Sequence, residues 1–364
     1  MARSLFDKIL QVVNMGFALA LLLSYASLYI SPTVFWHPAF FGLAYPYLLC
    51  ANLFFLFYWT TRFHVSLMIS LFVILAGCGL IARFVQVPFL KPGLPTIHQD
   101  KTIAALSYNV RGLFFMNQAG ERIPGDTLLA FLDHSPMQIL CLQEFPTLKA
   151  ESYAQNLSSM LDAKVSVHMD TPDDHTSGTG NATFSTFPIV GKGKIDIDKA
   201  SNLCIYTDLK IGKDTFRVYN CHLHSNRLIH NDLKFVENVG KVYDKQQIES
   251  LKEITLKLKK AYEIRSRQVD TLASHIAASP YKVLVFGDFN DTPVSYAYKK
   301  IRNNLSDAFI KAGLWTSPTY RKGFVAFRID FIFCDPEFSV MDYRCEPYAL
   351  SDHYPVFCRL SFPQ

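Results

Sequence analysis

Charged side chains are scarce in the first quarter of this 364-residue chain. Residues 1–96 contain five basic side chains and one acidic side chain, namely Arg3, Asp7, Lys8, Arg62, Arg83 and Lys91. Half of all residues in the chain are hydrophobic, and the mean hydropathy is positive at +0.13. So little charge over so long a segment is not typical of an ordinary soluble protein.

A basic excess is also missing from the rest of the chain. The whole sequence has a formal net charge of +5, and residues 1–96 account for +4 of it, which leaves about +1 for residues 97–364. A domain that holds DNA or RNA mainly through its phosphates normally has a clear surplus of lysine and arginine. The missing surplus argues against a domain of that kind.

Motifs of several hydrolase and metal-site classes are absent as well. The eight cysteines form no C-x-x-C pair and have no metal-ligand spacing, and four of them lie in apolar, strand-like runs as small core residues do. Such usage is more typical of a reducing compartment, although buried thiols are also tolerated outside one. The sequence has no Ser-His-Asp motif, no Walker glycine loop and no cysteine-nucleophile signature.

Three apolar stretches fill the N-terminal region, at about residues 9–30, 40–60 and 65–85. Each is close to the ~20 residues that cross a bilayer as a helix. We therefore predict that residues 1–96 are a membrane anchor of three transmembrane helices, ending in a linker at 91–95. A cleaved signal peptide and buried helices of a soluble protein are the alternatives.

The charges in the loops predict an orientation for this anchor. Arg3 and Lys8 precede the first apolar stretch, whereas residues 31–37 after it contain neither lysine nor arginine. Positive charge favours the cytoplasmic side, so the N-terminus is expected inside. Three crossings would place residues 97–364 outside the cytoplasmic membrane of a multi-pass protein, with the lipid bilayer as its partner.

The most informative stretch after the anchor is residues 283–293, an apolar run that ends in Gly-Asp-Phe-Asn. The run is rich in β-branched and aromatic residues and predicts a buried strand. Asp288 and Asn290 stand two positions apart, so their side chains point to the same side of an extended segment. Asp288 is placed to take a proton from a hydrolytic water and Asn290 to orient it. A plain strand followed by an Asx turn is the alternative.

Two earlier predicted strands end in polar residues in the same way. Asn109 ends the strand at 103–110, and Glu144 ends the strand at 139–144. Each residue alone is explained equally well by a turn, a cap or a surface charge. Repetition of the pattern indicates a polar site at the ends of several buried strands.

Eight short motifs in order resemble the endonuclease/exonuclease/phosphatase superfamily, which includes DNase I-like, exonuclease III-like and sphingomyelinase-like enzymes. They span residues 101–361 and comprise Ser107–Val110, Leu142–Glu144, Phe184–Ile189, Asn220–Leu223, Arg265–Gln268, Gly287–Asn290, Arg328–Ile332 and Ser351–Val356. The resemblance implies an α/β fold for residues 97–364: a four-layer αββα sandwich of two mixed β-sheets, with the site where the named strands end.

The resemblance also implies roles for individual residues. Asn109, Glu144 and Asp352 are expected to hold Mg²⁺, with Mn²⁺ as an alternative, because hard oxygen ligands suit these ions. The expected catalytic residues are Asp288 as base, Asn290 as its partner, His222 as donor to a phosphate oxygen, and His353 at the scissile phosphate, oriented by Asp330. Arg265 is expected to bind the substrate.

Two segments depart from the family pattern. An insertion at 224–261 ends in an amphipathic helix that we expect to cover a sheet, or to turn its lysines toward anionic lipid headgroups. The loop at 170–180 contains Asp173 and Asp174, and an acidic rim is unfavourable for a nucleic-acid backbone.

These features together predict a membrane-anchored, Mg²⁺-dependent phosphoesterase that hydrolyses a phosphate mono- or diester by in-line attack of water. A small or lipid-linked substrate is favoured. An extracytoplasmic endo- or exonuclease acting on DNA or RNA is the alternative, and a binding module without catalysis is the third interpretation. Nothing in the sequence predicts a protein partner.

Overall fold

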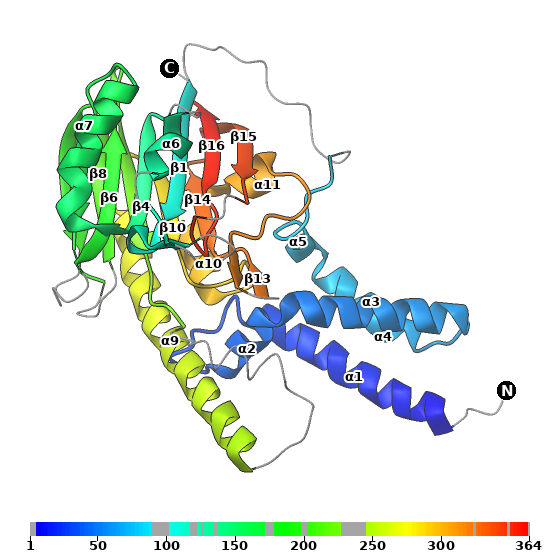
Figure 1. Ribbon diagram of the computed structural model, residues 1–364. Helices are drawn as coiled ribbons and strands as arrows, with labels where there is room; N and C mark the ends of the chain where they lie inside the picture. The colour runs from blue at the N-terminus through cyan, green and yellow to red at the C-terminus, as the bar shows by residue number, and fades with distance from the viewer. Residues whose placement is uncertain are drawn as a thin grey trace. The chain divides into compact units, whose positions relative to one another are not determined.

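The computed structural model describes residues 5–88, 102–116, 122–124, 127–133, 137–171, 178–197, 203–226, 245–322, 325–347 and 350–362 (Figure 1). The predicted linker at 91–95 and the acidic pair Asp173 and Asp174 lie outside these residues. The chain forms two compact units. The N-terminal unit consists of Met1–Ile81, Ser225–Arg267 and Val294–Lys299, and the sandwich unit consists of Ala82–His224, Gln268–Pro293 and Lys300–Gln364.

The N-terminal unit is helical. Its helices are α1 (Leu5–Ala26), α2 (His37–Leu43), α3 (Tyr45–Thr61), α4 (Leu67–Ala76) and α5 (Cys78–Ile81), together with the part of α9 (Lys245–Ala277) that precedes Gln268. Among the described residues, α1 is the single helix that is long and apolar enough to cross a bilayer by itself. Helices α2 and α3 pass the same test only as a pair, and they are bent by 69° at their junction.

The prediction of three transmembrane helices is therefore wrong for the described residues. The second stretch is interrupted because Pro46, at the start of α3, lacks the backbone N–H needed to continue a helix from α2. The third stretch ends early because Gly77 closes α4 after 10 residues. Counting apolar residues detects neither break, since a proline or a glycine barely changes the hydropathy of a long window.

Polar side chains lie inside the N-terminal unit. Ser70 of α4 donates a hydrogen bond to Asn14 Oδ1 of α1 at 2.7 Å and to Asn52 Oδ1 of α3 at 3.2 Å. All three side chains are buried, whereas large apolar side chains such as Phe57, 71% exposed, face outward. Apolar side chains such as Leu21 and Trp59 are buried beside these polar ones, but the exposed aromatic side chains are not typical of a soluble helical bundle.

The sandwich unit contains two six-stranded sheets. The first has the order β15-β16-β1-β4-β6-β5, with β1 Thr102–Asn109, β4 Ile139–Pro146, β5 Ser166–Asp170, β6 Thr179–Ser185, β15 Ser339–Cys345 and β16 Val356–Ser361. The second has the order β11-β14-β10-β9-β8-β7, with β7 Ile189–Ile195, β8 Leu203–Ile211, β9 Asp214–His222, β10 Lys282–Asp288, β11 Ser306–Asp307 and β14 Asp330–Cys334. Each sheet is mixed, because one central pair is parallel, β1 with β4 and β10 with β9, and the other pairs are antiparallel.

The two sheets pack face to face over one apolar core. This core joins Ile103 of β1 and Ile139 of β4 to Val218 of β9 and Phe286 of β10. Helices α6 (Thr127–Asp133) and α7 (Ala150–Met160) cover the outer face of the first sheet through a second apolar cluster (Figure 1). On the second sheet, the Tyr219 hydroxyl donates a hydrogen bond to the backbone oxygen of His275 near the end of α9 at 3.2 Å. The predicted fold of two mixed sheets with helices is confirmed.

Shorter elements complete the sandwich unit. They are the hairpins β2 Phe115–Met116 with β3 Arg122–Ile123 and β12 Tyr320–Lys322 with β13 Val325–Phe327, and the helices α10 Tyr296–Arg302 and α11 Ala308–Ala312. Helix α10 begins in the N-terminal unit, which ends at Lys299 in this part of the chain.

The predicted amphipathic helix of the insertion is confirmed as α9. Within the N-terminal unit, its apolar residues Ile254, Leu258 and Tyr262 pack against Ala39 and Phe40 of α2. In this part of α9 the apolar side therefore covers a helix, where we had expected a sheet. The alternative, that its lysines meet lipid headgroups, stays a prediction.

Candidate active site

Parallel pairing brings the ends of β9 and β10 to one edge of the second sheet. His222 stands opposite Asp288 in the register of β9 and β10, and Asp330 stands opposite Asp288 on the other side. The strands approach closely at Gly287, where a Cβ atom would lie 1.9 Å from the backbone oxygen of Cys221. Only glycine permits this pairing, and the site therefore depends on Gly287 directly before Asp288.

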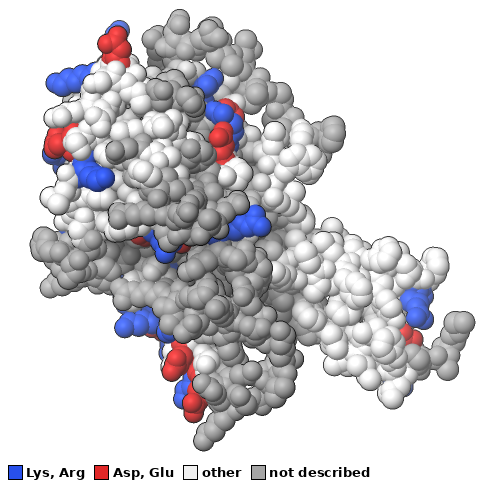
Figure 2. All heavy atoms as spheres, viewed as in Figure 1, with Lys and Arg blue, Asp and Glu red and all other residues white. Residues whose placement is uncertain are grey.

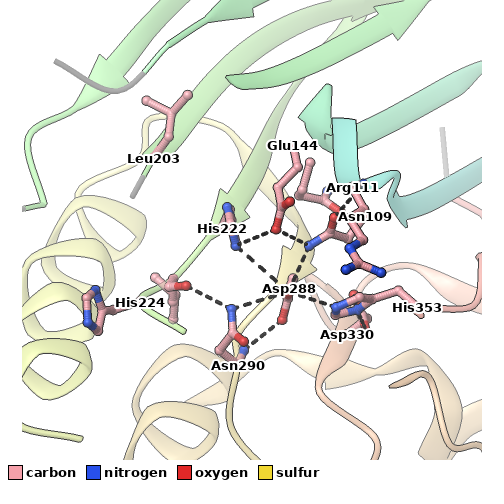
Figure 3. Close-up of polar contacts among 12 residues, drawn as sticks. Asn109, Arg111, Glu144, Leu203, His222, His224, Asp288, Asn290, Asp330 and His353 are labelled. Atoms are coloured by element: carbon pink, nitrogen blue, oxygen red, sulfur yellow. Dashed lines mark hydrogen bonds and ion pairs between the residues drawn. The ribbon is translucent and has the colours of Figure 1, made fainter. Parts of the chain in front are cut away.

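The carboxylate of Asp288 lies at the centre of the polar contacts (Figure 3). Its side chain is 1% exposed. Asn109 Nδ2 donates to Asp288 Oδ2 at 3.1 Å, and the backbone N–H of Asn290 donates to Oδ1 at 2.8 Å. Burial raises the pKa of Asp288, whereas the imidazoles of His353 and His222 act in the opposite direction. A carboxylate in this setting is a suitable proton acceptor.

Asn290 is held in a conformation that few residues adopt. Its φ of +52° is left-handed, a region in which asparagine is better tolerated than most residues. Its side-chain Nδ2 donates to the backbone oxygen of Leu223 at 2.9 Å and lies 3.3 Å from Asp288 Oδ2. The predicted pair of Asp288 and Asn290 therefore converges.

His353 is bound between two carboxylates. Its Nδ1 lies 3.0 Å from Asp330 Oδ2, and its Nε2 lies 3.6 Å from Asp288 Oδ2. Burial disfavours the protonated ring, but Asp330 and Asp288 outweigh burial and raise the pKa of His353 to about 10. Thr319 donates to Asp330 Oδ2 at 2.6 Å and so fixes the carboxylate that holds His353. At neutral pH this imidazole is a cationic donor.

Glu144 and His222 face each other beside Asn109. Asn109 Nδ2 donates to Glu144 Oε1 at 3.1 Å, and His222 Nε2 lies 3.6 Å from the same oxygen. Glu144 has a φ of +51°, an unfavourable conformation for glutamate. His222 Nε2 is buried and makes no hydrogen bond within the described part of the chain. An imidazole nitrogen left in this state has capacity for a ligand.

Arg111 is a site residue for which sequence reasoning gave no role. Its Nη1 lies 3.6 Å from Asp352 Oδ2, and its backbone N–H donates to Asn109 Oδ1 at 3.0 Å. The φ angles of Arg111, Gly112 and Leu113 are +46°, +68° and +60°, so a left-handed turn carries this side chain. The position two residues after Asn109 was the only signal in the sequence.

Asp352 is linked to Asn109 only indirectly, because Arg111 contacts both residues. The described residues show no hydrogen bond or ion pair between Asp352 and Asn109 or Glu144, its two predicted partners in metal binding. Tyr320, which sequence reasoning also missed, packs its ring against His353 with 5.0 Å between the ring centroids. Burial, followed by the charges of Asp352 and Asp288, raises the pKa of Tyr320 to about 12, so its hydroxyl stays protonated.

Arg265 lies on α9 in the N-terminal unit and is 1% exposed. Its guanidinium lies 5.0 Å from the centroid of the Tyr262 ring. Its role in substrate binding stays a prediction. In the sandwich unit, Gln268 of the same motif accepts a hydrogen bond from the backbone N–H of His224 at 3.0 Å. This contact holds the chain just beyond His222.

The side chains around Asp288 suit a divalent cation. Asp288, Asp330 and His353 each place a possible ligand atom within 4.8 Å of the others, but the protonated form of His353 has no lone pair for a cation. Asn109 adds a second place where oxygens converge, since its Nδ2 lies 3.1 Å from both Glu144 Oε1 and Asp288 Oδ2. Carboxylate oxygens are preferred by hard cations such as Mg²⁺. Asp288 belongs to both groups.

The sequence matches the model described as Endonuclease/Exonuclease/phosphatase family over residues 106–353, and a domain of unknown function (DUF8431) over residues 7–84. No curated protein matches the chain. Several solved structures match the chain. The three described next are 16–18% identical to it, and each alignment covers 71–72% of this chain.

They are a family protein from Bacteroides thetaiotaomicron (17% identity, 98% of that chain, TM-score 0.49), the human Nocturnin catalytic domain with bound sulfate anion (18%, 95%, 0.50) and a family protein from Leptotrichia buccalis (16%, 100%, 0.50). At this identity, the two likenesses with a TM-score of 0.50 show the fold alone. The family model spans more than half of the sequence and includes every strand end of the site. This chain belongs to the endonuclease/exonuclease/phosphatase family.

Proposed function

We propose that this chain is a membrane-anchored, Mg²⁺-dependent phosphoesterase that hydrolyses a phosphate mono- or diester. Members of its family are hydrolases that act on phosphoesters. The observation that carries the proposal is the convergence of two imidazoles and two amide side chains on the buried carboxylate of Asp288. Among the described residues, those with a hydrogen bond or ion pair to Asp288 include no Ser or Cys, and we propose water as the nucleophile.

Asp288 acts as the general base. It accepts a proton from the water as the water oxygen attacks phosphorus, and the bond between phosphorus and the ester oxygen breaks. Asn290 keeps Asp288 in place through its backbone N–H. Because burial raises the pKa of Asp288, this carboxylate is a stronger base than an exposed aspartate.

Two imidazoles serve the phosphate oxygens. His353 is cationic at neutral pH and donates to an oxygen on which negative charge develops. His222 Nε2, which lacks a hydrogen bond among the described residues, supplies a second donor in its protonated-nitrogen form. Asp330 orients His353, and Thr319 orients Asp330. The donors are thus fixed before the substrate binds.

A divalent cation would be held by the carboxylate of Glu144, and Asp352 and the amide oxygen of Asn109 are the further ligands that we propose. When bound, such an ion supplies positive charge against the phosphate oxygens and the leaving oxygen.

The N-terminal unit supports the membrane part of the proposal. The face of α1, α3 and α4 in Figure 2 is almost free of charged side chains, except at the end where α1 begins and α3 ends. Exposed Phe57 and Phe72 and the buried pair Asn14 and Ser70 fit helices that pack through polar contacts inside and meet lipid outside. We propose that this unit anchors the chain with its N-terminus inside, and an odd number of crossings would then put the sandwich unit on the extracytoplasmic side.

Hydrolysis by the full chain in detergent micelles tests the proposal. The panel comprises phospholipids, inositol phosphates, nucleotides and plasmid DNA, each with Mg²⁺ and again with excess chelator. We expect chelator-sensitive turnover of a small or lipid-linked phosphoester. Plasmid nicking that is faster than every other turnover would favour the nuclease. Absence of turnover on the whole panel would favour a binding module without catalysis.

A further inference from the structure

One short segment of the catalytic half of the sequence belongs to the N-terminal unit. Residues Val294–Lys299 group with the N-terminal helices, although the residues on both sides of them belong to the sandwich unit. Val294 is fully buried. At the other end of the segment, Lys299 Nζ lies 5.0 Å from the centroid of the Tyr29 ring. The helices therefore hold both ends of the segment.

The carbonyl group of Val294 is held by the ends of two N-terminal helices. The hydroxyl of Ser27, directly after α1, has two acceptors for its one proton, Ser24 O at 2.6 Å and Val294 O at 2.9 Å. At Gly42 of α2, a Cβ atom would lie 2.3 Å from Val294 O and 2.5 Å from Ser27 Oγ. A contact this short with a backbone atom cannot be relieved by a side-chain rotation. Any residue larger than glycine at position 42 must displace Val294.

Val294 follows the catalytic loop almost at once. It stands four residues after Asn290 and six after Asp288. The residues between them are themselves fixed: Thr292 N–H donates to Asp291 Oδ1 at 2.9 Å, and Pro293 O accepts from Arg83 Nη1 at 2.9 Å. Only three residues connect Asn290 to Val294, and each spans at most about 3.6 Å, so this short connection absorbs little displacement. A displacement of Val294 is therefore passed along the chain toward Asn290.

We propose that Ser27 and Gly42 are positioning residues for the phosphoesterase reaction, and that they act through Val294 on the loop that carries Asp288 and Asn290. This inference rests on the proposed function. A general base must stay within a fraction of an ångström of its productive position, and a misplacement of about 1 Å costs on the order of a hundredfold in rate.

Gly42→Ala in the full chain tests the proposal, with Gly16→Ala of α1 and Gly79→Ala of α5 as matched controls. A Cβ at either control position meets no atom within 4 Å, so the same chemical change is harmless there. We expect Gly42→Ala to lower kcat at least about tenfold with little change in KM, and Ser27→Ala to lower it less, because the loop holds the base rather than the substrate. The controls keep the kcat of the wild type.

A second measurement separates this inference from the proposed function. Hydrogen exchange of the backbone amides at 286–294 reports the loop directly and needs no turnover. We expect Gly42→Ala to speed this exchange at least about tenfold, and the two controls to leave it unchanged. If the wild type turns over no phosphoester, the proposed function fails and the exchange result alone decides the positioning role. Unchanged exchange in Gly42→Ala, or equal loss of kcat in all three variants, overturns the inference.

Discussion

At the scale of single residues, the charge of His353 depends on its carboxylate neighbours. Asp330 and Asp288 raise its pKa to about 10 against the effect of burial. A raised pKa means that the imidazolium is fully present at neutral pH and is lost as the pH rises through about 10. Because the proton on His353 is needed for donation to the phosphate, kcat should fall with rising pH in that range.

Asp330→Asn tests this dependence. The variant replaces a negative neighbour by a neutral one, so the alkaline fall in kcat should move to lower pH and kcat at neutral pH should drop on the order of tenfold or more. Asp342→Asn on β15, where the aspartate pairs with Arg344 at 3.1 Å, is a matched control that should behave as the wild type. An alkaline limb that stays in place in Asp330→Asn would show that His353 is not the group that titrates.

The sequence predicted some site residues and not others, for a physical reason. Asn109, Glu144 and Asp288 stand where apolar strands end, and parallel pairing of β1 with β4 and of β10 with β9 brings such ends to one edge. Thr319 gives no such signal, because it lies in a loop 11 residues before Asp330 and reaches that carboxylate only in the folded chain. The side-chain contacts of Arg111 likewise depend on a left-handed turn that its residue types do not specify.

At the scale of elements, one histidine links the two sheets. His168 of β5 in the first sheet lies 2.8 Å through Nδ1 from Thr207 Oγ1 of β8 in the second, and it is 4% exposed. Burial, and next the charge of Lys192, lower the pKa of His168 to about 4. The folded protein therefore keeps this ring neutral at pH values where an unfolded chain, with a pKa of about 6.5, takes up a proton.

Stability should consequently fall as the pH is lowered from about 6.5 to about 4. A single group of this kind contributes at most about 1.4 kcal/mol per pH unit to the free energy of unfolding. His168→Gln should flatten this dependence in thermal melts of the full chain. Thr207→Val, which removes only the hydroxyl partner, should keep it because burial is the main cause. Identical melting curves for the wild type and His168→Gln across that window would contradict this assignment.

The helix boundaries in the N-terminal unit could not be predicted from hydropathy alone. The stretch at 40–60 is apolar throughout, but its bend at the start of α3 comes from the geometry of Pro46, which hydropathy does not measure. The grouping of Val294–Lys299 with these helices was not predictable either, because no local pattern marks a contact between residues 267 positions apart.

At the scale of the whole molecule, the resemblance of eight motifs was enough to predict the two mixed sheets and their helices. Seven of the motifs lie at a strand end or in the turn beside one, and Arg265–Gln268 lies within α9. The structure of residues 1–96 was less predictable from the sequence. An apolar composition indicates that a segment lies in lipid, but it does not give the number of helices that cross the bilayer.

The proposed anchor predicts how the chain behaves on fractionation. The exposed apolar side chains of α1, α3 and α4 should keep the full chain in the membrane fraction through a wash at alkaline pH, and detergent should release it. Protease added to intact spheroplasts should then digest the sandwich unit if it lies outside the cytoplasmic membrane. Release by the alkaline wash alone would contradict an embedded anchor, and full protection from protease would place the sandwich unit inside.

The central claim is that Asp288 is the base of a phosphoesterase, and turnover of Asp288→Asn by the full chain in micelles with Mg²⁺ tests it most directly. Asp342→Asn of β15 is the matched control, because it makes the same chemical change in a half-exposed side chain that pairs with Arg344 at 3.1 Å. We predict a loss on the order of a hundredfold or more in kcat for Asp288→Asn with an unchanged melting temperature, and near-normal kcat for Asp342→Asn. A kcat for Asp288→Asn within a few-fold of the wild type would contradict the account.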